Sequence, residues 1–201
     1  MSNLNQVRIE GGTATQGCYY WGGCPDTSFH LRLFADACGP ITGEPFCFGD
    51  GSGTPCPCGN ASPVGNHEGC RNSLNAVNGG KLVASGSASL SNDTLVLAGS
   101  QMPATASVLY FQGTTRQNSG LGTVFGDGLQ CAGGVHVRLG MHVNANGSST
   151  YPISGDSSVS VRGQVITPAT RTYQVWYRNS AAFCTPATYN LTNGWEISWG
   201  P

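Results

Sequence analysis

The tetrapeptide FGDG occurs twice in the sequence, at Phe48–Gly51 and at Phe125–Gly128, and each copy lies near a cysteine. After the first copy, Asp50, Ser52 and Thr54 have the D-x-S-x-T spacing that supplies one carboxylate and two hydroxyls to some divalent-cation sites. Calcium takes roughly six to eight oxygen ligands, more than these three side chains offer. Asp-Gly is also a strong turn signal, because glycine accepts positive φ and aspartate hydrogen-bonds to its own backbone. We therefore interpret FGDG as a tight turn used twice, keep the calcium site as the weaker alternative, and expect no cofactor.

The nine cysteines are the second chemical feature of the chain. Cys56-Pro57-Cys58 has C-x-C spacing, but no second matched pair and no neighbouring histidine completes a zinc site. Disulfides explain the pattern better, and the cysteines in or beside the β-rich part allow three bridges among Cys47, Cys56, Cys58, Cys70, Cys131 and Cys184. Among these we favour Cys131 with Cys184, a loop closure worth about 4 kcal/mol in the chain-entropy model. The odd total leaves at least one cysteine, most simply among Cys18, Cys24 and Cys38, as a free thiol or an intermolecular bridge.

Residue types suited to catalysis are present, but their spacing does not assemble a site. His136 and His142 would lie about 20 Å apart on one strand, so a single metal ion cannot bind both, and both are expected to be exposed. The sequence contains no G-x-S-x-G, H-E-x-x-H, G-x-x-x-x-G-K or G-x-G-x-x-G motif. A carboxylate pair for glycoside hydrolysis stays formally open, although Glu196 stands alone and the aspartates occupy turn-like sequences, namely Asp50, Asp93, Asp127 and Asp156. We therefore expect a protein that is not an enzyme.

Two groups of aromatic residues are candidates for stacking on sugar rings. Tyr19, Tyr20 and Trp21 form a YYW cluster, for which the sequence favours neither glycan contact nor a structural role. Trp195 and Trp199 flank Ile197 on one face of the last predicted strand, and such an apolar face favours burial in a core. The YYW cluster is therefore the candidate glycan contact.

The composition limits the environment and the partners of the chain. Only 9% of its 201 residues are charged, with nine Lys+Arg against ten Asp+Glu, so no basic stripe is available to bind nucleic acid. No apolar run approaches the ~20 residues that span a bilayer, so membrane insertion is not expected. Nine cysteines in such a polar chain favour an oxidising compartment, extracellular or periplasmic, and we expect a secreted protein in the extracellular space or at the cell surface. The N-terminal sequence MSNLNQVRIE lacks the apolar stretch of a signal peptide, so export would need a signal that was removed or that lies in a longer precursor.

The elements that must position these residues are short strands. From about Lys81 onward, segments with period-two alternation are separated by Gly, Asn, Ser and Pro turns. One segment is expected to bury the face formed by Val135, Val137, Leu139, Met141 and Val143. The segment SVSVRGQVI is expected to do the same with Val159, Val161 and Val165. Further strands are predicted at KLVASGSASL, TLVLAG, SVLYFQG, LGTVFG, TYQVWYR and GWEISW. About eight strands with no helical period predict an all-β fold, a two-sheet β-sandwich or jelly roll.

Residues 1–45 differ from the rest of the chain, because they contain three cysteines and little regular apolar pattern. This stretch cannot form a core alone. Two short pieces, VRIE and FHLRL, alternate in polarity, and each can add to a sheet as an edge strand through Val7 and Ile9 or through Phe29, Leu31 and Leu33. We predict an N-terminal arm, residues 1–45, and a disulfide-stapled β-sandwich domain, residues 46–201.

Residues 46–201 contain FCFGDGSGTPCPCGN, LYFQGTTR, FGDGLQCAGG, SVSVRG, RTYQVWYRN and NLTNGWE. In these glycine, cysteine and aromatic positions the chain resembles a Cys- and Gly-rich β module of secreted or surface bacterial proteins, a module of uncharacterised function. The resemblance implies extracellular placement and a cysteine-stapled β fold, and it implies no activity and no catalytic residues. The arm lies outside it.

Two main hypotheses follow for the function. The leading one is a non-catalytic extracellular structural protein that assembles with itself into a filament, fibril or surface layer when the arm docks on a neighbouring copy. A nearly uncharged surface permits close packing, and a head-to-tail contact that does not close produces an open filament. The alternative is a carbohydrate-binding or adhesion module that uses Tyr19, Tyr20 and Trp21. An unrecognised hydrolase and a passive spacer module are weaker alternatives.

Overall fold

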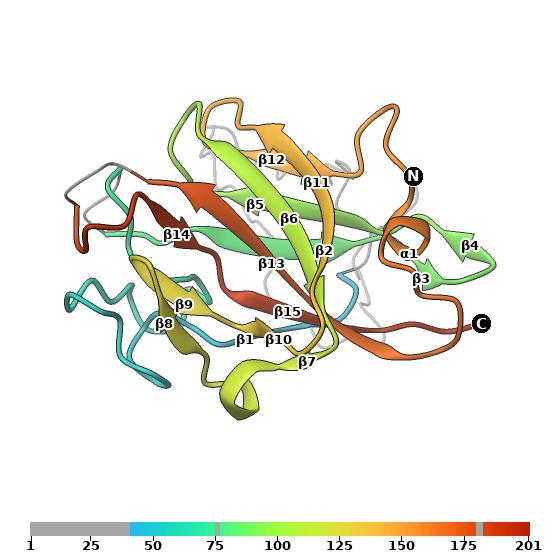
Figure 1. The fold of residues 1–201 in the computed structure, drawn as a ribbon, viewed down its shortest axis with the longest axis horizontal. Helices are drawn as coiled ribbons and strands as arrows, with labels where there is room; N and C mark the ends of the chain where they lie inside the picture. Colours follow the sequence, from blue (N-terminus) through green and yellow to red (C-terminus); the bar gives the residue numbers. More distant parts are fainter. Residues whose placement is uncertain (1–40, 75–76, 180–182) are drawn as a thin grey trace, which may run out of the picture. The chain divides into compact units, whose positions relative to one another are not determined.

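The computed structural model describes residues 41–74, 77–179 and 183–201, all of which belong to the unit Ala37–Pro201. These residues form an all-β fold of antiparallel sheets (Figure 1). The largest sheet has the order β1-β15-β13-β6-β11, and β14 also pairs with β13. Its strands are β1 (Glu44–Phe46), β6 (Ser107–Gly113), β11 (Val137–Val143), β13 (Thr170–Arg178), β14 (Tyr189–Leu191) and β15 (Gly194–Ser198). A second sheet has the order β12-β5-β2 and consists of β2 (Lys81–Ser85), β5 (Val96–Ser100) and β12 (Ser149–Tyr151).

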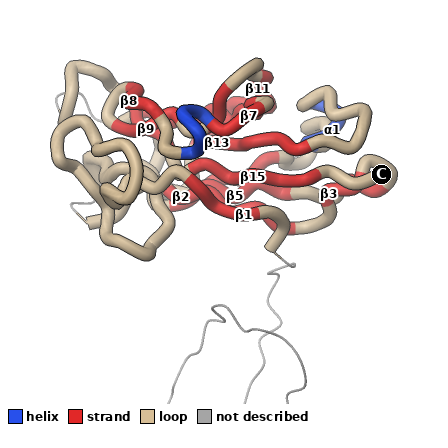
Figure 2. Tube along the Cα trace, turned by 90° about the horizontal axis from the view of Figure 1, so that it is seen from below, coloured by secondary structure: helices blue, strands red, loops and turns tan. Residues whose placement is uncertain are grey.

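Three small strand pairs and two short helical turns complete the described elements. The pairs are β3 (Ala88–Ser89) with β4 (Asn92–Asp93), β7 (Thr115–Arg116) with β10 (Ala132–Gly133), and β8 (Thr123–Phe125) with β9 (Gly128–Gln130). The helical turns are η1 (Gln117–Gly120) and α1 (Val159–Arg162). Figure 2 shows β2 and β5 on one side of β13 and β15, with the β8–β9 hairpin on the other side.

Both large sheets contribute side chains to one core. Leu82 and Leu97 enter it from the second sheet, and Tyr110, Val175 and Ile197 enter it from the first. The buried hydroxyl and indole groups of this core are hydrogen-bonded, since Trp199 Nε1 donates to Tyr173 Oη at 2.8 Å and Tyr110 Oη donates to the Ser149 carbonyl at 2.7 Å. Trp195 and Trp199 are 4% and 3% exposed, which confirms that the last strand buries its tryptophan face.

The strands predicted at KLVASGSASL, TLVLAG, SVLYFQG, LGTVFG, TYQVWYR and GWEISW are all present as β2 with β3, β5, β6, β8, β13 and β15. The prediction for SVSVRGQVI is wrong, because this segment contains α1 and leaves Val161 68% exposed. The backbone N–H of Ser160 donates to Asp93 Oδ2 at 2.7 Å. This acceptor at the start of the helical turn comes from β4, so local alternation could not reveal it.

The prediction that Val135, Val137, Leu139, Met141 and Val143 share one buried face is also wrong. Arg138 pairs with Phe111 and Gly140 pairs with Tyr110, so Leu139 is an extra residue, a β-bulge without a partner on β6. Leu139 is buried, but Met141 and Val143 are 70% and 65% exposed. A single inserted residue exchanges the two faces of the strand beyond it.

The free side of β2 is closed by a side chain instead of a strand. The buried amide of Asn193 accepts a hydrogen bond from Leu82 N at 2.8 Å and donates to Leu82 O at 3.2 Å. The N–H of Thr42 donates to the Ala84 carbonyl at 3.1 Å on the same strand. Unpaired backbone groups at a sheet edge favour aggregation, and these contacts remove them from β2.

Candidate functional site

The two FGDG copies are both turns, as predicted. In the first copy, Asp50 Oδ1 accepts hydrogen bonds from Ser52 N at 3.0 Å and Ser52 Oγ at 2.5 Å. Partial desolvation acts to raise the pKa of Asp50, but the bonds from Ser52 and from backbone groups outweigh it, so the pKa is lowered. The hydroxyl of Thr54 donates to the Gly122 carbonyl at 2.7 Å. The hydroxyls of the suggested calcium site are thus engaged within the protein, and in the described ranges no group of three or more His, Cys, Asp and Glu side chains is placed to hold a metal ion.

The second copy has a different role, because Asp127 is fully buried at the tip of the β8–β9 hairpin. Its Oδ1 accepts hydrogen bonds from Thr185 N and Thr185 Oγ1, both at 2.8 Å, and its Oδ2 accepts one from Asn179 Nδ2 at 2.8 Å. Its carbonyl accepts a further bond from Asn60 Nδ2 at 2.9 Å. Asp127 therefore connects the hairpin to two loops that are far apart in the sequence.

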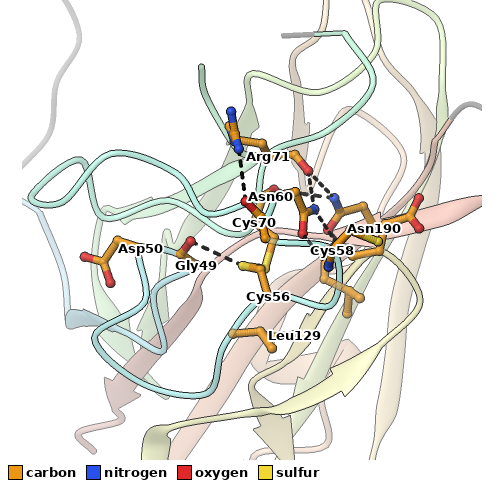
Figure 3. Close-up of a disulfide and its surroundings, with 12 residues drawn as sticks. Gly49, Asp50, Cys56, Cys58, Asn60, Cys70, Arg71, Leu129 and Asn190 are labelled. Atoms are coloured by element: carbon orange, nitrogen blue, oxygen red, sulfur yellow. Dashed lines mark hydrogen bonds between the residues drawn. A yellow bond between two sulfur atoms is a disulfide. The ribbon is translucent and has the colours of Figure 1, made fainter. Parts of the chain in front are cut away.

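Three disulfides lie around these loops, and they use the six cysteines expected to pair. The bridges are Cys47–Cys131, Cys56–Cys70 and Cys58–Cys184. The favoured pair Cys131–Cys184 is wrong, because Cys131 lies beside Phe46 and Leu129 under the end of β1, whereas Cys184 lies in the loop that Asp127 holds. Figure 3 shows the Cys56–Cys70 bridge, where Asn60 and Asn190 both donate to the Arg71 carbonyl. Cys18, Cys24 and Cys38 lie outside the described residues.

The two histidines of the β11 segment differ in their surroundings. His136 is exposed, as predicted, and packs its ring edge against Phe111 at 5.7 Å. The prediction that His142 is also exposed is wrong, because its side chain is only 11% exposed. The bulge at Leu139 turns His142 inward, where its Nε2 lies 3.2 Å from Asp156 Oδ2 and its ring contacts Tyr151 at 5.9 Å.

The bulge also completes a row of apolar side chains on the outer face of the large sheet. We define the outer row as Phe125, Tyr189, Trp176, Leu109, Met141 and Val143. Trp176 pairs with Leu109 and Leu109 pairs with Met141, so these side chains are direct cross-strand neighbours on one face. The ring centroids of Phe125 and Tyr189 are 5.0 Å apart, and those of Tyr189 and Trp176 are 5.6 Å apart. Arg178 lies at one side, with its guanidinium carbon 5.5 Å from the Trp176 ring.

Gln174 holds the aromatic end of the outer row in place. Its Nε2 donates to the carbonyls of Leu129 and Thr192 at 2.8 and 2.7 Å, and its Oε1 accepts from Cys131 N at 2.8 Å. These bonds fix β9 against β13 and β14. The β8–β9 hairpin then carries Phe125, which is 41% exposed, to the ring of Tyr189.

The outer row ends at the free edge strand β11. Arg162 Nε donates to the carbonyls of Arg138 and Leu139, both at 3.1 Å, so a side chain covers the first half of this edge. Within the described part of the chain, no strand pairs with β11 on the side away from β6. Beside the second half, a hollow of about 260 Å³ separates β11 from β12 and is lined by His142, Val143, Ala145, Ser148, Ser149, Thr150 and Ile153.

Sequence reasoning missed the outer row, because its members come from five strands and depend on an unpredicted bulge. Two sets of predicted functional residues lie outside the described residues. They are the assembly residues Val7, Ile9, Phe29, Leu31 and Leu33 and the glycan-contact residues Tyr19, Tyr20 and Trp21. Glu44 and Pro45, which the sequence placed in the arm, pair with β15 in the large sheet. No helix in the described ranges is long and apolar enough to cross a membrane.

Comparison of the chain with protein-family models, curated proteins and solved structures gives no match. The resemblance to a secreted Cys- and Gly-rich β module therefore stays a prediction.

Proposed function

We propose that this protein is a non-catalytic extracellular structural protein whose copies assemble into a filament, fibril or surface layer. The outer row carries the proposal, because exposed apolar side chains that continue across several strands to a free edge favour a protein contact. In this assembly the N-terminal arm of one copy covers the outer row of the next. A contact of this kind is heterologous, so repetition produces an open chain of subunits unless its rotation closes a ring.

The three disulfides indicate an oxidising environment of the extracellular type. For the domain itself we propose a two-sheet sandwich of the jelly-roll kind, because side chains of both large sheets meet in one core. A fold that is cross-linked by disulfides stays folded outside the cell, which a structural subunit requires. The low charge of the whole sequence, 9%, lowers the repulsion and desolvation costs of close packing between copies.

The acidic residues support a role without catalysis. Each carboxylate in the described ranges takes part in an ion pair or hydrogen bond that has a structural role. Glu44 and Glu196 pair with Arg116, and buried Glu68 accepts from Gly79 N at 3.1 Å. The four aspartates hold turns, a helix start or loops, namely Asp50, Asp93, Asp127 and Asp156. This use of the carboxyl groups favours architecture over acid–base chemistry.

The test is light scattering and electron microscopy of the native, unreduced full chain. We expect regular assemblies from the unmodified protein and monomers from the double variant Met141→Lys, Val143→Lys, because two charges would enter an apolar contact. Ile166→Lys is the matched control, since Ile166 is 86% exposed and precedes the opposite end of β13 from Trp176. Near-ultraviolet circular dichroism checks that each variant is folded. An unmodified protein that stays monomeric at high concentration would refute the assembly.

A second candidate function is carbohydrate binding, and the Phe125–Tyr189–Trp176 ladder with adjacent Arg178 favours it. Aromatic faces stack on sugar rings, and an arginine beside them can donate to hydroxyls. If this function holds, Phe125→Ala or, for the arm cluster, Trp21→Ala abolishes retention on a glycan column. The size of the protein in solution should then stay unchanged, which distinguishes this function from assembly.

A further inference from the structure

We propose that the segment Phe29–Leu33 of a second copy adds as a strand to the free half of β11, Gly140–Val143, with its apolar side chains continuing the outer row. This inference rests on the proposed assembly and names the two surfaces that meet. It makes the contact a sheet augmentation, in which backbone hydrogen bonds supply affinity and alternate side chains supply specificity.

The β11 edge is better suited to accept a strand than the other free edges of the large sheets. β1 and β12 have three residues each, and proline interrupts both edges, at Pro45 within β1 and at Pro152 directly after β12. Proline has no N–H to donate to a ladder. The third edge, β2, is occupied by Asn193 and Thr42, and β14 has only three residues, with its Tyr189 carbonyl accepting from Asp127 N. Only the half of β11 beyond the Arg162 contacts combines exposed apolar neighbours with an open side among the described strands.

The alternation of the FHLRL segment matches the two faces of this edge. Phe29, Leu31 and Leu33 would lie on the outer face beside Met141 and Val143, which are 70% and 65% exposed. On the opposite face, His30 and Arg32 would lie over the hollow between β11 and β12.

The charge around that hollow is complementary to this segment. Asp156 presents a carboxylate that is 26% exposed, and hydroxyl side chains of β12 line the same hollow. Arg32 can pair with Asp156, although His142 Nε2 and the Ile153 N–H already lie against the same carboxylate and compete for it. In the other alternating piece, VRIE, Glu10 would lie on the same face as Arg8. Its carboxylate would then lie near Asp156 and repel it. FHLRL carries no acidic residue and is the better occupant.

A second copy is a better source of the strand than the same chain. The described chain enters at Ile41, which bridges Ser85, and continues into β1 at the opposite edge of the large sheet from β11. Seven residues separate Leu33 from Ile41, and the eight Cα–Cα steps between them reach about 28 Å when fully extended. The four strand spacings from β1 to β11 already take about 19 Å in a straight line through the sheet. A path around the β8–β9 hairpin is longer, so a copy's own arm would have to be almost taut.

A narrow occupant also fits the size of the surface. Stable contacts between two proteins bury about 800 Å² on each partner. Apolar patches on monomeric proteins typically expose a few hundred Å², and such an area does not reach that size through a flat contact alone. A strand adds a ladder of backbone hydrogen bonds to the apolar contact.

The direct test is photo-crosslinking in the full chain. A Leu31→p-benzoylphenylalanine variant is mixed with isotopically heavy unmodified protein, allowed to assemble and irradiated. We expect mixed-isotope peptides that join position 31 to the peptide containing Met141 and Val143. Crosslinks confined to a single isotope would mean that the chain's own arm occupies the edge, and crosslinks elsewhere would remove β11 as the acceptor. Either result overturns the inference while the assembly itself can still be seen by microscopy.

A charge-reversal series gives an independent readout of the same contact. Arg32→Glu should raise the concentration needed for assembly about tenfold at low salt, and less at high salt where charges are screened. Arg8→Glu is the matched control and should change it by less than about twofold. Asp156→Lys combined with Arg32→Glu should recover most of the loss. Equal effects of Arg32→Glu and Arg8→Glu would contradict the pairing, whereas an unmodified protein that never assembles would refute the proposed function as well.

Discussion

Asp127→Ala should cost far more folding stability than Asp50→Ala, although both aspartates occupy the third position of the same tetrapeptide. Asp127 is fully buried and accepts three side-chain hydrogen bonds from Asn179 and Thr185. Asp50 accepts two from Ser52 in an exposed loop. The two variants therefore remove the same chemical group from opposite environments.

The size of the difference follows from the donors that lose their acceptor. In Asp127→Ala, the Thr185 N–H and the Asn179 amide are left without a partner, while the Thr185 hydroxyl can rotate away. The buried Asn179 donor costs about 1–3 kcal/mol when it has no partner, and the half-buried Thr185 N–H adds less, which gives about 1–4 kcal/mol in total. In Asp50→Ala, water replaces the lost acceptor, so we expect a loss of less than about 1 kcal/mol. The first loss is a large fraction of the ~5–15 kcal/mol that stabilises a typical domain.

The assay is equilibrium unfolding in guanidinium chloride without a reductant, so that the three disulfides stay closed in both states. The free energy of unfolding is obtained from the midpoint and the slope of each transition. Mass spectrometry of the unreduced variants should show that Cys58–Cys184, next to Thr185, still forms. Equal losses in the two variants would refute the reasoning, because they would show that burial of Asp127 adds nothing to its hydrogen bonds.

Two further predictions concern the buried tyrosines and the bridges. Burial raises the pKa of four tyrosines, namely Tyr110, Tyr151, Tyr173 and Tyr177. Unfolded tyrosine ionises near pH 10. The stability that these tyrosines contribute is therefore complete below about pH 10 and is lost as the pH rises through their folded pKa values. Tyrosinate absorbance from this group should therefore appear together with the loss of near-ultraviolet circular dichroism, and its appearance in a protein with intact dichroism would contradict the assignment. Replacing both cysteines of Cys58–Cys184 by serine should lower the free energy of unfolding by about 5 kcal/mol, against about 3 kcal/mol for Cys56–Cys70, because the sequence separations are 126 and 14. A larger loss for the short loop, measured by the same denaturant titration, would show that loop closure does not determine the order.

The sequence predicted the all-β class and most long strands because their alternation is local information. SVLYFQG and GWEISW follow the period of two, and the buried tryptophans of the second segment confirm which face is inside. The β11 segment has the clearest alternation in the chain, yet this alternation predicted the wrong buried face. Nothing in the local sequence shows that Leu139 lacks a partner on β6. A bulge belongs to a pair of strands, so it is invisible in either strand alone.

The candidate site was less predictable than the fold. Phe125, Trp176 and Met141 lie in three separate segments, and only the strand order β13-β6-β11 and the hairpin contact bring them into one row. The cysteine pairing failed for a similar reason. Which loops meet at one end of the fold depends on contacts such as Asp127 with Thr185, which span 58 residues of sequence.

The Cys58–Cys184 bridge also determines how a subunit would bear mechanical load. Tension applied before Ile41 and at Pro201 passes along the backbone to Cys58, crosses the disulfide to Cys184 and leaves by the C-terminal strands. The chain between these two cysteines, which includes β2 to β13, lies off this covalent path and carries no tension through its backbone. Only β1, β14, β15 and the loops joined to them can be pulled out. The subunit can therefore lengthen only by a short, fixed amount, because the chain between Cys58 and Cys184 stays enclosed by the disulfide.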